Sequence, residues 1–410
     1  MNKTPQTLKG FRDFLPAEKK KRDWVQKKIT EVFDRFGFEP LETPTLEYAD
    51  LLLGKYGDEA DKLVYTFEDK GGRRVGLRYD QTVPTARVLG QYQNELPKYF
   101  RRYQIQNVFR ADKPQKGRYR EFTQCDIDIF GSTSSLSDAE ILACTYQAFK
   151  NIGFTNITIK LNFRPNLIAT IKPFITEAVS EFSIIQTIDK LGKLSTDAIV
   201  SELVSKGLSP DQAQAVLPTV TNQNIPSEIE VVTQQAQQLG VNSITFDPTL
   251  ARGLDYYTGM IFEVIIPEFT VGSVGGGGRY DNLINDLTGT NIPAVGMAFG
   301  FDRTVEAAEE LGLIPTDQSS TQVLVTIFNQ TQASLIAAKD LRLAGINTEL
   351  YPAQDKLDKQ LKYANKAGIP WVIVIGDQEA AENKVALKNM ATGDQQTLSI
   401  DEAISQLRTG

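Results

Sequence analysis

The sequence contains no histidine, and this absence excludes several kinds of catalytic site. Without histidine there is no Ser-His-Asp or Cys-His nucleophilic triad, no imidazole general base and no histidine-ligated metal. The two cysteines, Cys125 and Cys144, form neither a CxxC pair nor a Cys-rich zinc site. Any catalysis must therefore use arginine, carboxylates, amides, hydroxyls and oxygen-bound Mg²⁺.

Long apolar runs and an excess of positive charge are missing as well. No segment approaches the roughly 18 apolar residues that a membrane span requires, and residues 1–16 contain charges and prolines where a signal peptide needs an apolar stretch. The net charge is −7, so a polyanion must be held by a local basic patch. Because two cysteines make no disulfide framework, we expect a cytoplasmic protein without a membrane partner.

The residue patterns predict two domains and an insertion. Residues 1–320 combine helical periodicity, as in Lys19 to Phe36, with consecutive strand-like runs that are typical of an antiparallel sheet. Within them, residues 166–240 are Gln/Ser/Thr-rich and helical, which predicts a helical insertion. Residues 321–410 alternate strand and helix with glycines at the helix ends, so we expect an α/β domain with a mainly parallel sheet. The expected fold class is an α+β domain on an antiparallel sheet, followed by this α/β domain.

The segment from Lys98 to Arg120 has eight basic residues and one acid, interleaved with aromatic residues. Its strand-loop-strand pattern places arginines on both sides of a Pro/Gly-containing loop. Such an arrangement can bind a triphosphate or a nucleic-acid end, and an aromatic ring can stack on a base. A solvated basic hairpin explains the composition equally well.

A second segment, Leu250 to Glu263, places Arg252 and Asp255 among apolar residues beside two tyrosines. Taken as an extended strand, it puts Arg252, Leu254 and Tyr256 on one face. A buried guanidinium needs a partner, so pairing with Asp255 or another carboxylate is the simpler interpretation. If a phosphate binds there, one Arg–phosphate pair at about 4 Å and an effective dielectric constant near 20 contributes roughly 4 kcal/mol.

Glycines dominate a third region. Gly275 to Gly278 predicts a glycine-dense turn, and Gly296 and Gly300 stand four residues apart in an apolar run that leads to Arg303. Glycine permits close approach to a ligand or to a neighbouring strand, although tight packing explains the pattern equally well. The region matches neither a Walker A loop nor a dinucleotide-binding fingerprint.

Together these segments resemble the three motifs of class II aminoacyl-tRNA synthetases. Motif one resembles the helix that ends at Phe36-Gly37-Phe38 with the strand that reaches Pro44, and in the family it builds the dimer interface. Motif two resembles FRADKPQKGRYREF, and motif three resembles GMAFGFDR. The more specific sequences RGLDYYTG, RYREFTQCDIDIFG and GGGGRYD are similar to the histidyl-tRNA synthetase family. The resemblance covers nearly the whole chain, and residues 321–410 resemble the class IIa anticodon-binding domain.

The resemblance implies a homodimeric ligase that joins L-histidine to tRNA-His through a histidyl-adenylate, using ATP and Mg²⁺. Arg252 and Arg110 would be the catalytic residues, because the family uses them to stabilise charge at the α-phosphate. The other implied contacts fall into three groups. ATP would be bound by Arg110, Asp112, Phe122 and Arg303, with Phe122 stacking on adenine. Histidine would be bound by Asp80, Thr82, Gln124, Asp128, Tyr256 and Tyr257. The tRNA acceptor end would be bound by Lys113, Gln115, Lys116 and Arg118.

This chain departs from the family at three acidic positions. Asp80, Asp112 and Asp128 stand where relatives often have glutamate. The charge is kept, but the shorter side chains leave the contact geometry open.

Three other functions remain as alternatives. The first is a non-catalytic, synthetase-like regulatory paralogue of histidine biosynthesis, against which the retained Arg110, Arg252 and Arg303 count. The second is a class IIa synthetase for glycine, proline or threonine, against which RGLDYYTG counts. The third is a tRNA-binding module without catalysis. ATP–pyrophosphate exchange with each amino acid decides between the synthetases, whereas neither the regulatory paralogue nor the tRNA-binding module would show exchange.

Overall fold

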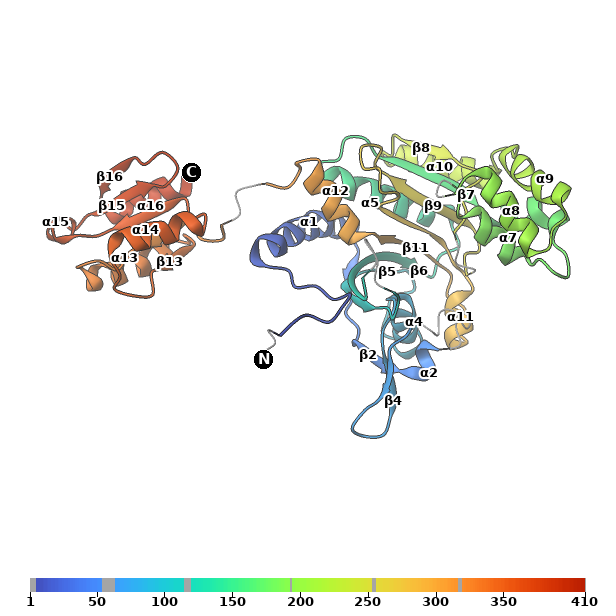
Figure 1. Cartoon of the computed structure of the whole chain (residues 1–410), viewed down its shortest axis with the longest axis horizontal. Helices are drawn as coiled ribbons and strands as arrows, with labels where there is room; N and C mark the ends of the chain where they lie inside the picture. Colours follow the sequence, from blue (N-terminus) through green and yellow to red (C-terminus); the bar gives the residue numbers. More distant parts are fainter. Residues whose placement is uncertain are drawn as a thin grey trace. The chain divides into compact units, whose positions relative to one another are not determined.

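The computed structural model describes residues 5–53, 63–113, 119–191, 194–252, 256–315 and 319–409. The chain divides into two compact units, residues 1–314 and 315–410 (Figure 1). Within the described ranges, no helix has the length and apolar character needed to cross a bilayer.

An eight-stranded sheet forms the centre of the first unit, and neighbouring strands pair antiparallel except at its two edges. The antiparallel sheet expected from the sequence is therefore confirmed. In spatial order the strands are β1 (Glu39–Pro40), β5 (Phe100–Phe109), β6 (Glu121–Phe130), β11 (Ala294–Phe299), β10 (Gly275–Arg279), β9 (Met260–Ile265), β7 (Thr158–Phe163) and β8 (Ile244–Phe246). A separate three-stranded antiparallel sheet consists of β2 (Leu46–Tyr48), β4 (Arg74–Leu77) and β3 (Thr66–Glu68).

Helices cover both faces of the large sheet (Figure 1). The helices that share the main core with one face are α1 (Pro16–Arg35), α5 (Ser135–Ile152), α10 (Ser227–Gln238) and α12 (Phe301–Glu310). Part of the other face packs against α4 (Thr82–Gln91) and α11 (Leu283–Thr288), and the short helix α2 (Ala49–Leu52) packs beside β4.

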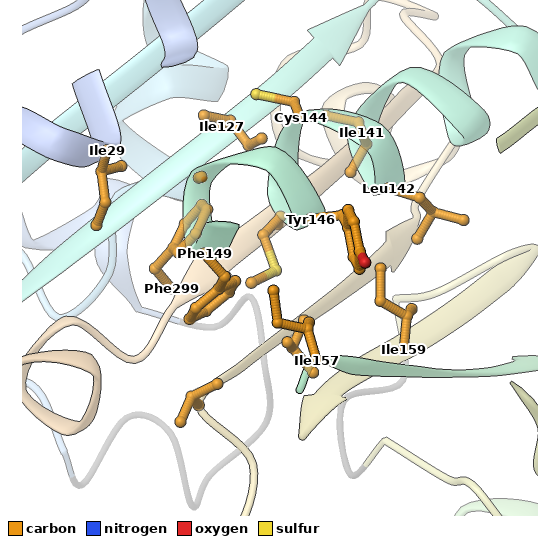
Figure 2. Packing of buried hydrophobic residues seen from close by; sticks show 14 of the residues in the cluster. Ile29, Ile127, Ile141, Leu142, Cys144, Tyr146, Phe149, Ile157, Ile159 and Phe299 are labelled. Atoms are coloured by element: carbon orange, nitrogen blue, oxygen red, sulfur yellow. The ribbon is translucent and has the colours of Figure 1, made fainter. Parts of the chain in front are cut away.

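The main core explains the orientation of strand β6. Its side chains at Cys125, Ile127 and Ile129 are buried in this core. Figure 2 shows Ile127 there, near Phe149 of α5 and Phe299 of β11. Because side chains alternate along a strand, the polar residues between these apolar ones face the opposite side of the sheet. The sheet thus presents one apolar face and one polar face at β6.

A smaller group of helices has a core of its own. It comprises α6 (Arg164–Ile171), the 3₁₀ turn η1 (Lys172–Phe174), α7 (Glu181–Ile188), α8 (Thr196–Lys206) and α9 (Pro210–Thr221). Helix α9 begins with a capping box, in which the Ser209 side chain accepts from the Gln212 amide and Gln212 accepts from the Ser209 amide. Helix α10 differs from its neighbours, because its apolar side chains enter the main core instead.

The second unit contains a five-stranded sheet that is mixed and not mainly parallel as the sequence predicts. Strand β12 pairs in parallel with β13 and β14, whereas β14, β15 and β16 pair antiparallel. Only five residues join β15 to β16, which is too short for the crossover that parallel strands require. The elements are β12 (Val323–Val325), α13 (Thr331–Leu343), β13 (Thr348–Leu350), α14 (Leu357–Lys366), β14 (Trp371–Val374), α15 (Asp377–Ala381), β15 (Val385–Asn389), β16 (Gln395–Leu398) and α16 (Ile400–Thr409).

Candidate functional site

Two adjoining cavities lie on the polar face of β6, with volumes of about 500 Å³ and about 330 Å³. We refer to them as the larger and the smaller cavity. Their linings share Arg110, Gln124, Arg252, Gly276 and Ala298. A ligand that occupies both would therefore pass between two guanidinium groups.

The larger cavity brings together three arginines from distant parts of the sequence, Arg110, Arg252 and Arg303. The Nε of Arg110 donates to the carbonyl of Tyr79 at 3.1 Å, and its guanidinium lies 5.1 Å from the centroid of the Phe122 ring. The exposed Arg303 donates through Nη1 to the carbonyl of Ser273 at 3.0 Å. Neither guanidinium forms an ion pair with another described residue, so an anion can bind both.

Arg252 lies at the junction of the two cavities and pairs with Glu263 on β9, Nη1 to Oε1 at 2.7 Å. Burial lowers the pKa of Arg252, but Tyr257 and Glu263 outweigh that effect and raise it above its ordinary value. The guanidinium is therefore ionised at every physiological pH. Its partner is a carboxylate other than Asp255, which lies outside the described residues.

The extended strand expected around Arg252 is wrong for the residues that are described. Strand β9 begins only at Met260, and Leu250 to Arg252 lie outside any strand. The side-chain amide of Asn162 on β7 donates to the carbonyls of Pro248 and Leu250 at 3.0 and 2.8 Å, which holds this segment as a loop.

The glycine-dense segment Gly275 to Gly278 is strand β10, so the predicted turn is wrong. Its glycines leave space for functional side chains. A β-carbon on Gly276 would lie 2.7 Å from Nη1 of Arg252, and one on Gly278 would lie 2.9 Å from the ring of Tyr257. On the adjacent strand β11, a β-carbon on Gly296 would overlap the carboxylate of Asp128. As expected, glycine at these positions allows other groups to come close to the backbone. The glycines lie in strands of the sheet and not in a turn.

The smaller cavity brings together all six residues that the resemblance implies for histidine: Asp80, Thr82, Gln124, Asp128, Tyr256 and Tyr257. Asp80 precedes helix α4, where its Oδ1 accepts from the Val83 amide at 3.1 Å. Burial raises the pKa of Asp80 to about 6. The ring centroids of Tyr256 and Tyr257 are 4.6 Å apart.

Asp128 is held by two partners that sequence reasoning missed. Arg102 on β5 places Nη2 2.7 Å from Oδ2, and the hydroxyl of Tyr280 donates to Oδ1. Burial raises the pKa of Asp128, and the guanidinium of Arg102 opposes that effect. The carboxylate is thus fixed in orientation, and its charge is balanced by Arg102.

Asp126 is a second carboxyl in this wall, and sequence reasoning did not single it out. It lines the smaller cavity, is 4% exposed, and its Oδ1 has no hydrogen-bond partner among the described residues. Burial raises its pKa to about 8. The alternation of β6 could have found it, because Gln124, Asp126 and Asp128 occupy every second position.

An N-terminal contact that the sequence did not indicate lies beside the larger cavity, because its partners Tyr119 and Asp302 line it. Arg12 pairs with Asp302 at 2.6 Å and lies 3.3 Å from the ring centroid of Tyr119. Arg22 also pairs with Asp302. The carbonyl of Gly10 accepts from the Arg120 amide at 2.8 Å. These contacts connect the N-terminal segment, the start of β6 and the start of α12.

The residues implied for the tRNA acceptor are only partly described. Lys113 is described and exposed. The residue before it, Asp112, is implied for ATP and lines the larger cavity. Gln115, Lys116 and Arg118 lie outside the described residues.

No group of three or more carboxylate or cysteine side chains suited to a metal ion occurs in the described part of the chain. Both cysteines are free and buried.

Comparisons with known proteins show which family the chain resembles. The family model "Histidyl-tRNA synthetase" matches residues 10–304, and "Anticodon binding domain" matches residues 322–409. The chain is 38% identical to the histidine–tRNA ligase of Cytophaga hutchinsonii, over 98% of this chain and 99% of that protein, and 39% identical to that of Wolinella succinogenes, over 99% and 98%. The crystal structure of histidyl-tRNA synthetase from Nostoc sp. PCC 7120 matches with a TM-score of 0.85 and 29% identity, covering 100% of both chains. A Bacillus halodurans structure described as an ATP phosphoribosyltransferase regulatory subunit/histidyl-tRNA synthetase shares the fold, with a TM-score of 0.71, 21% identity and coverage of 88% and 96%. The chain therefore belongs to the histidyl-tRNA synthetase family.

Proposed function

We propose that this protein ligates L-histidine to tRNA-His at the expense of ATP. The observation that supports this function most directly is the junction of the two cavities. One contains the arginines suited to phosphates, the other contains acids and phenols suited to a polar amino acid, and Arg110 and Arg252 line both.

In the first step a carboxylate oxygen of histidine attacks the α-phosphorus of ATP. The new O–P bond forms as the bond to the bridging oxygen breaks, giving histidyl-adenylate and pyrophosphate. The nucleophile is already ionised, so no general base is needed. The step requires positioning and positive charge where negative charge develops. Arg252 is suited to both, because Glu263 fixes its guanidinium at the junction.

On the nucleotide side, Arg110 and Arg303 would bind the phosphates, Phe122 would stack on adenine and Asp112 would contact the base. Mg²⁺ bound to the phosphates would neutralise part of their charge. Arg110 already lies beside the Phe122 ring, so the base and the phosphates are bound by neighbouring groups.

On the amino-acid side, Asp80, Thr82 and Gln124 would hold the ammonium group, and Asp128, Tyr256 and Tyr257 would line the imidazole site. A site built to hydrogen-bond a polar ring can reject ligands that lack it by roughly 10⁴–10⁵-fold, because its buried polar groups would be left unpaired. This specificity requires no editing domain.

In the second step the terminal ribose hydroxyl of tRNA-His takes the histidyl group, and AMP leaves. Lys113, Gln115, Lys116 and Arg118 would contact the acceptor end, and residues 322–409 would contact the anticodon. A homodimer in the cytoplasm, as the resemblance implies, belongs to the same proposal.

Charging of a tRNA-His transcript with a panel of amino acids tests this function. We expect attachment of histidine and no attachment of glycine, proline or threonine. A protein that binds the transcript but charges it with none of them is a binding module or a regulatory paralogue, and that result would refute the proposal.

A further inference from the structure

The wall of the larger cavity contains an acid beside one of the arginines that the proposed function assigns to the phosphates of ATP. Asp302 lines this cavity and directly precedes Arg303. Its side chain is only 15% exposed, so water and salt screen its charge weakly. A triphosphate carries several negative charges, and a carboxylate in the wall repels it. The cavity therefore suits ATP only while the charge of Asp302 is neutralised and its carboxylate is kept away from the phosphates.

Two guanidinium groups from the N-terminal part of the chain hold this carboxylate, one at each oxygen. Arg12 binds Oδ2 at 2.6 Å, and Arg22 on α1 donates from Nη1 to Oδ1. Neither arginine lines the larger or the smaller cavity. A ligand in the larger cavity thus meets Asp302 itself, and the two guanidiniums lie behind it.

Arg22 is also fixed by other groups of the same wall. Its Nη2 donates to the hydroxyl of Thr123 on β6 at 2.9 Å. Its guanidinium lies 4.1 Å from the ring centroid of Phe14 and 4.9 Å from that of Phe301, the first residue of α12. Thr123 and Phe301 both line the larger cavity. One side chain therefore contacts three residues of the cavity wall, from β6 and from α12, without entering the cavity.

Resting on the function proposed above, we propose that Arg22 is a positioning residue for ATP that acts through Asp302. Its guanidinium keeps the Asp302 carboxylate neutralised and directed at the N-terminal arginines. Without Arg22, Oδ1 loses its partner, and the side chain is free to turn into the cavity and repel the phosphates. Arg22 touches no reacting atom, so its effect reaches the substrate only through the carboxylate that it holds.

A simpler role for Arg22 is to fasten α1 to α12, since a buried ion pair between two helices restrains both of them. Loss of a fastening contact disturbs the whole wall, and it affects any ligand of the larger cavity. Loss of the proposed restraint affects only ligands that carry phosphate, and only while residue 302 carries a negative charge. These two differences separate the roles.

A double-mutant cycle in the full chain tests the dependence on charge. The KM for ATP is measured by histidine-dependent pyrophosphate exchange for the wild type, Arg22→Ala, Asp302→Asn and the double variant. We expect Arg22→Ala to raise this KM about tenfold when Asp302 is present, the effect of one lost charge-assisted contact. On the Asp302→Asn background, Arg22→Ala should change it by less than about threefold, because a neutral amide does not repel phosphate. The KM for histidine should not change in Arg22→Ala.

Arg101→Ala is the matched control. Arg101 pairs with Glu140 at 2.6 Å, its guanidinium lies 5.9 Å from the ring centroid of Phe38, and it lines neither cavity. Its removal costs a comparable ion pair and aromatic contact, so it should leave the KM for ATP unchanged.

Inhibition by adenosine, which has no phosphate, tests the dependence on phosphate. Its Ki against ATP should be the same for Arg22→Ala and the wild type, whereas a displaced wall would weaken adenosine and ATP together. Thermal unfolding of each variant shows whether it is folded. If Arg22→Ala does not fold, Arg22→Met takes its place, because it keeps an unbranched side-chain stem between the two phenylalanine rings.

The proposal is overturned if the variant without Arg22 has the wild-type KM for ATP, if the increase is equally large on the Asp302→Asn background, or if the Ki for adenosine rises as much as the KM for ATP. Each of these results leaves the proposed function intact when the wild type shows histidine-dependent exchange. Absence of exchange in the wild type removes the proposed function instead. Equilibrium binding of ATP and adenosine to the same variants then still decides whether Arg22 acts through Asp302.

Discussion

The guanidinium of Arg252 lies so close to Gly276 that a β-carbon on this glycine would be 2.7 Å from Nη1. At this position of β10, glycine leaves room for the guanidinium of Arg252 and for the backbone carbonyl of Phe262, which would lie 2.8 Å from the same β-carbon. The same relationship recurs between Gly278 and Tyr257 and between Gly296 and Asp128. The large side chains that line the cavities can occupy their positions because the adjacent residues of the sheet have no side chain.

Substitution of Gly276 by alanine should therefore displace Arg252. We expect the kcat of histidine-dependent pyrophosphate exchange to fall by about 10²–10³-fold, as when one charge-stabilising donor is lost from an active site. Gly71→Ala, in the exposed turn between β3 and β4, is the control and should keep full activity. A Gly276→Ala variant with wild-type kcat would show that Arg252 does not need this space.

Asp80 should make histidine binding sensitive to acid. Its pKa is raised to about 6 by burial, so the carboxyl is ionised above that pH and protonated below it. The ionised form attracts the substrate ammonium, so the affinity advantage of wild type over Asp80→Asn should be full at pH 7.5 and disappear as the pH falls below 6. Measuring the ratio of the two KM values across this range cancels the titration of histidine itself. A ratio that is constant with pH would contradict this role of Asp80.

Arg12 should influence ATP and not histidine. It contacts Tyr119 and Asp302, and both residues line only the larger cavity. We expect Arg12→Ala to raise the KM for ATP about tenfold, the effect of one charge-assisted hydrogen bond, and to leave the KM for histidine unchanged. Lys19→Ala, which removes an exposed ion pair with Asp23 on α1, is the matched control. Equal increases in both KM values would point to a general loss of structure instead.

The capping box of α9 should stabilise its helix without affecting catalysis. Replacing Ser209 by alanine removes the side chain that accepts from the Gln212 amide, which typically costs about 1 kcal/mol. Amide hydrogen exchange in α9 should become faster, while exchange of β6 amides and pyrophosphate exchange stay unchanged. Protection of α9 equal to that of the wild type would indicate that packing of the small helical core, and not the cap, holds this helix.

The parts of the fold that follow from local patterns could be predicted from the sequence. Alternation marks β6, and the Ser209 to Gln212 spacing marks the start of α9. The resemblance supplied the residues of the smaller cavity, because its motifs keep polar residues at fixed positions. Gly275 to Gly278 misled the prediction, since glycine is common in turns and its role in this strand depends on side chains from other segments.

Individual side-chain pairs between distant segments could not be predicted. Arg12 and Asp302 are 290 residues apart, and nothing in the composition of either segment indicates the pair. From the sequence, the partner of Arg252 could be any nearby carboxylate. Only the structure, in which the loop at Arg252 lies beside β9, shows that it is Glu263. The unpartnered Oδ1 of Asp126 becomes visible only once the surrounding side chains of the described structure are placed.

The central claim is that arginines far apart in the sequence meet around one nucleotide phosphate beside an amino-acid cavity. Histidine-dependent ATP–pyrophosphate exchange by wild type and Arg252→Ala measures this most directly, with equilibrium binding of histidine and ATP measured on the same samples. We predict that the variant binds both substrates with affinities close to wild type and loses at least about 10²-fold in the rate of exchange. An exchange rate equal to that of the wild type would contradict the role of Arg252 at the junction.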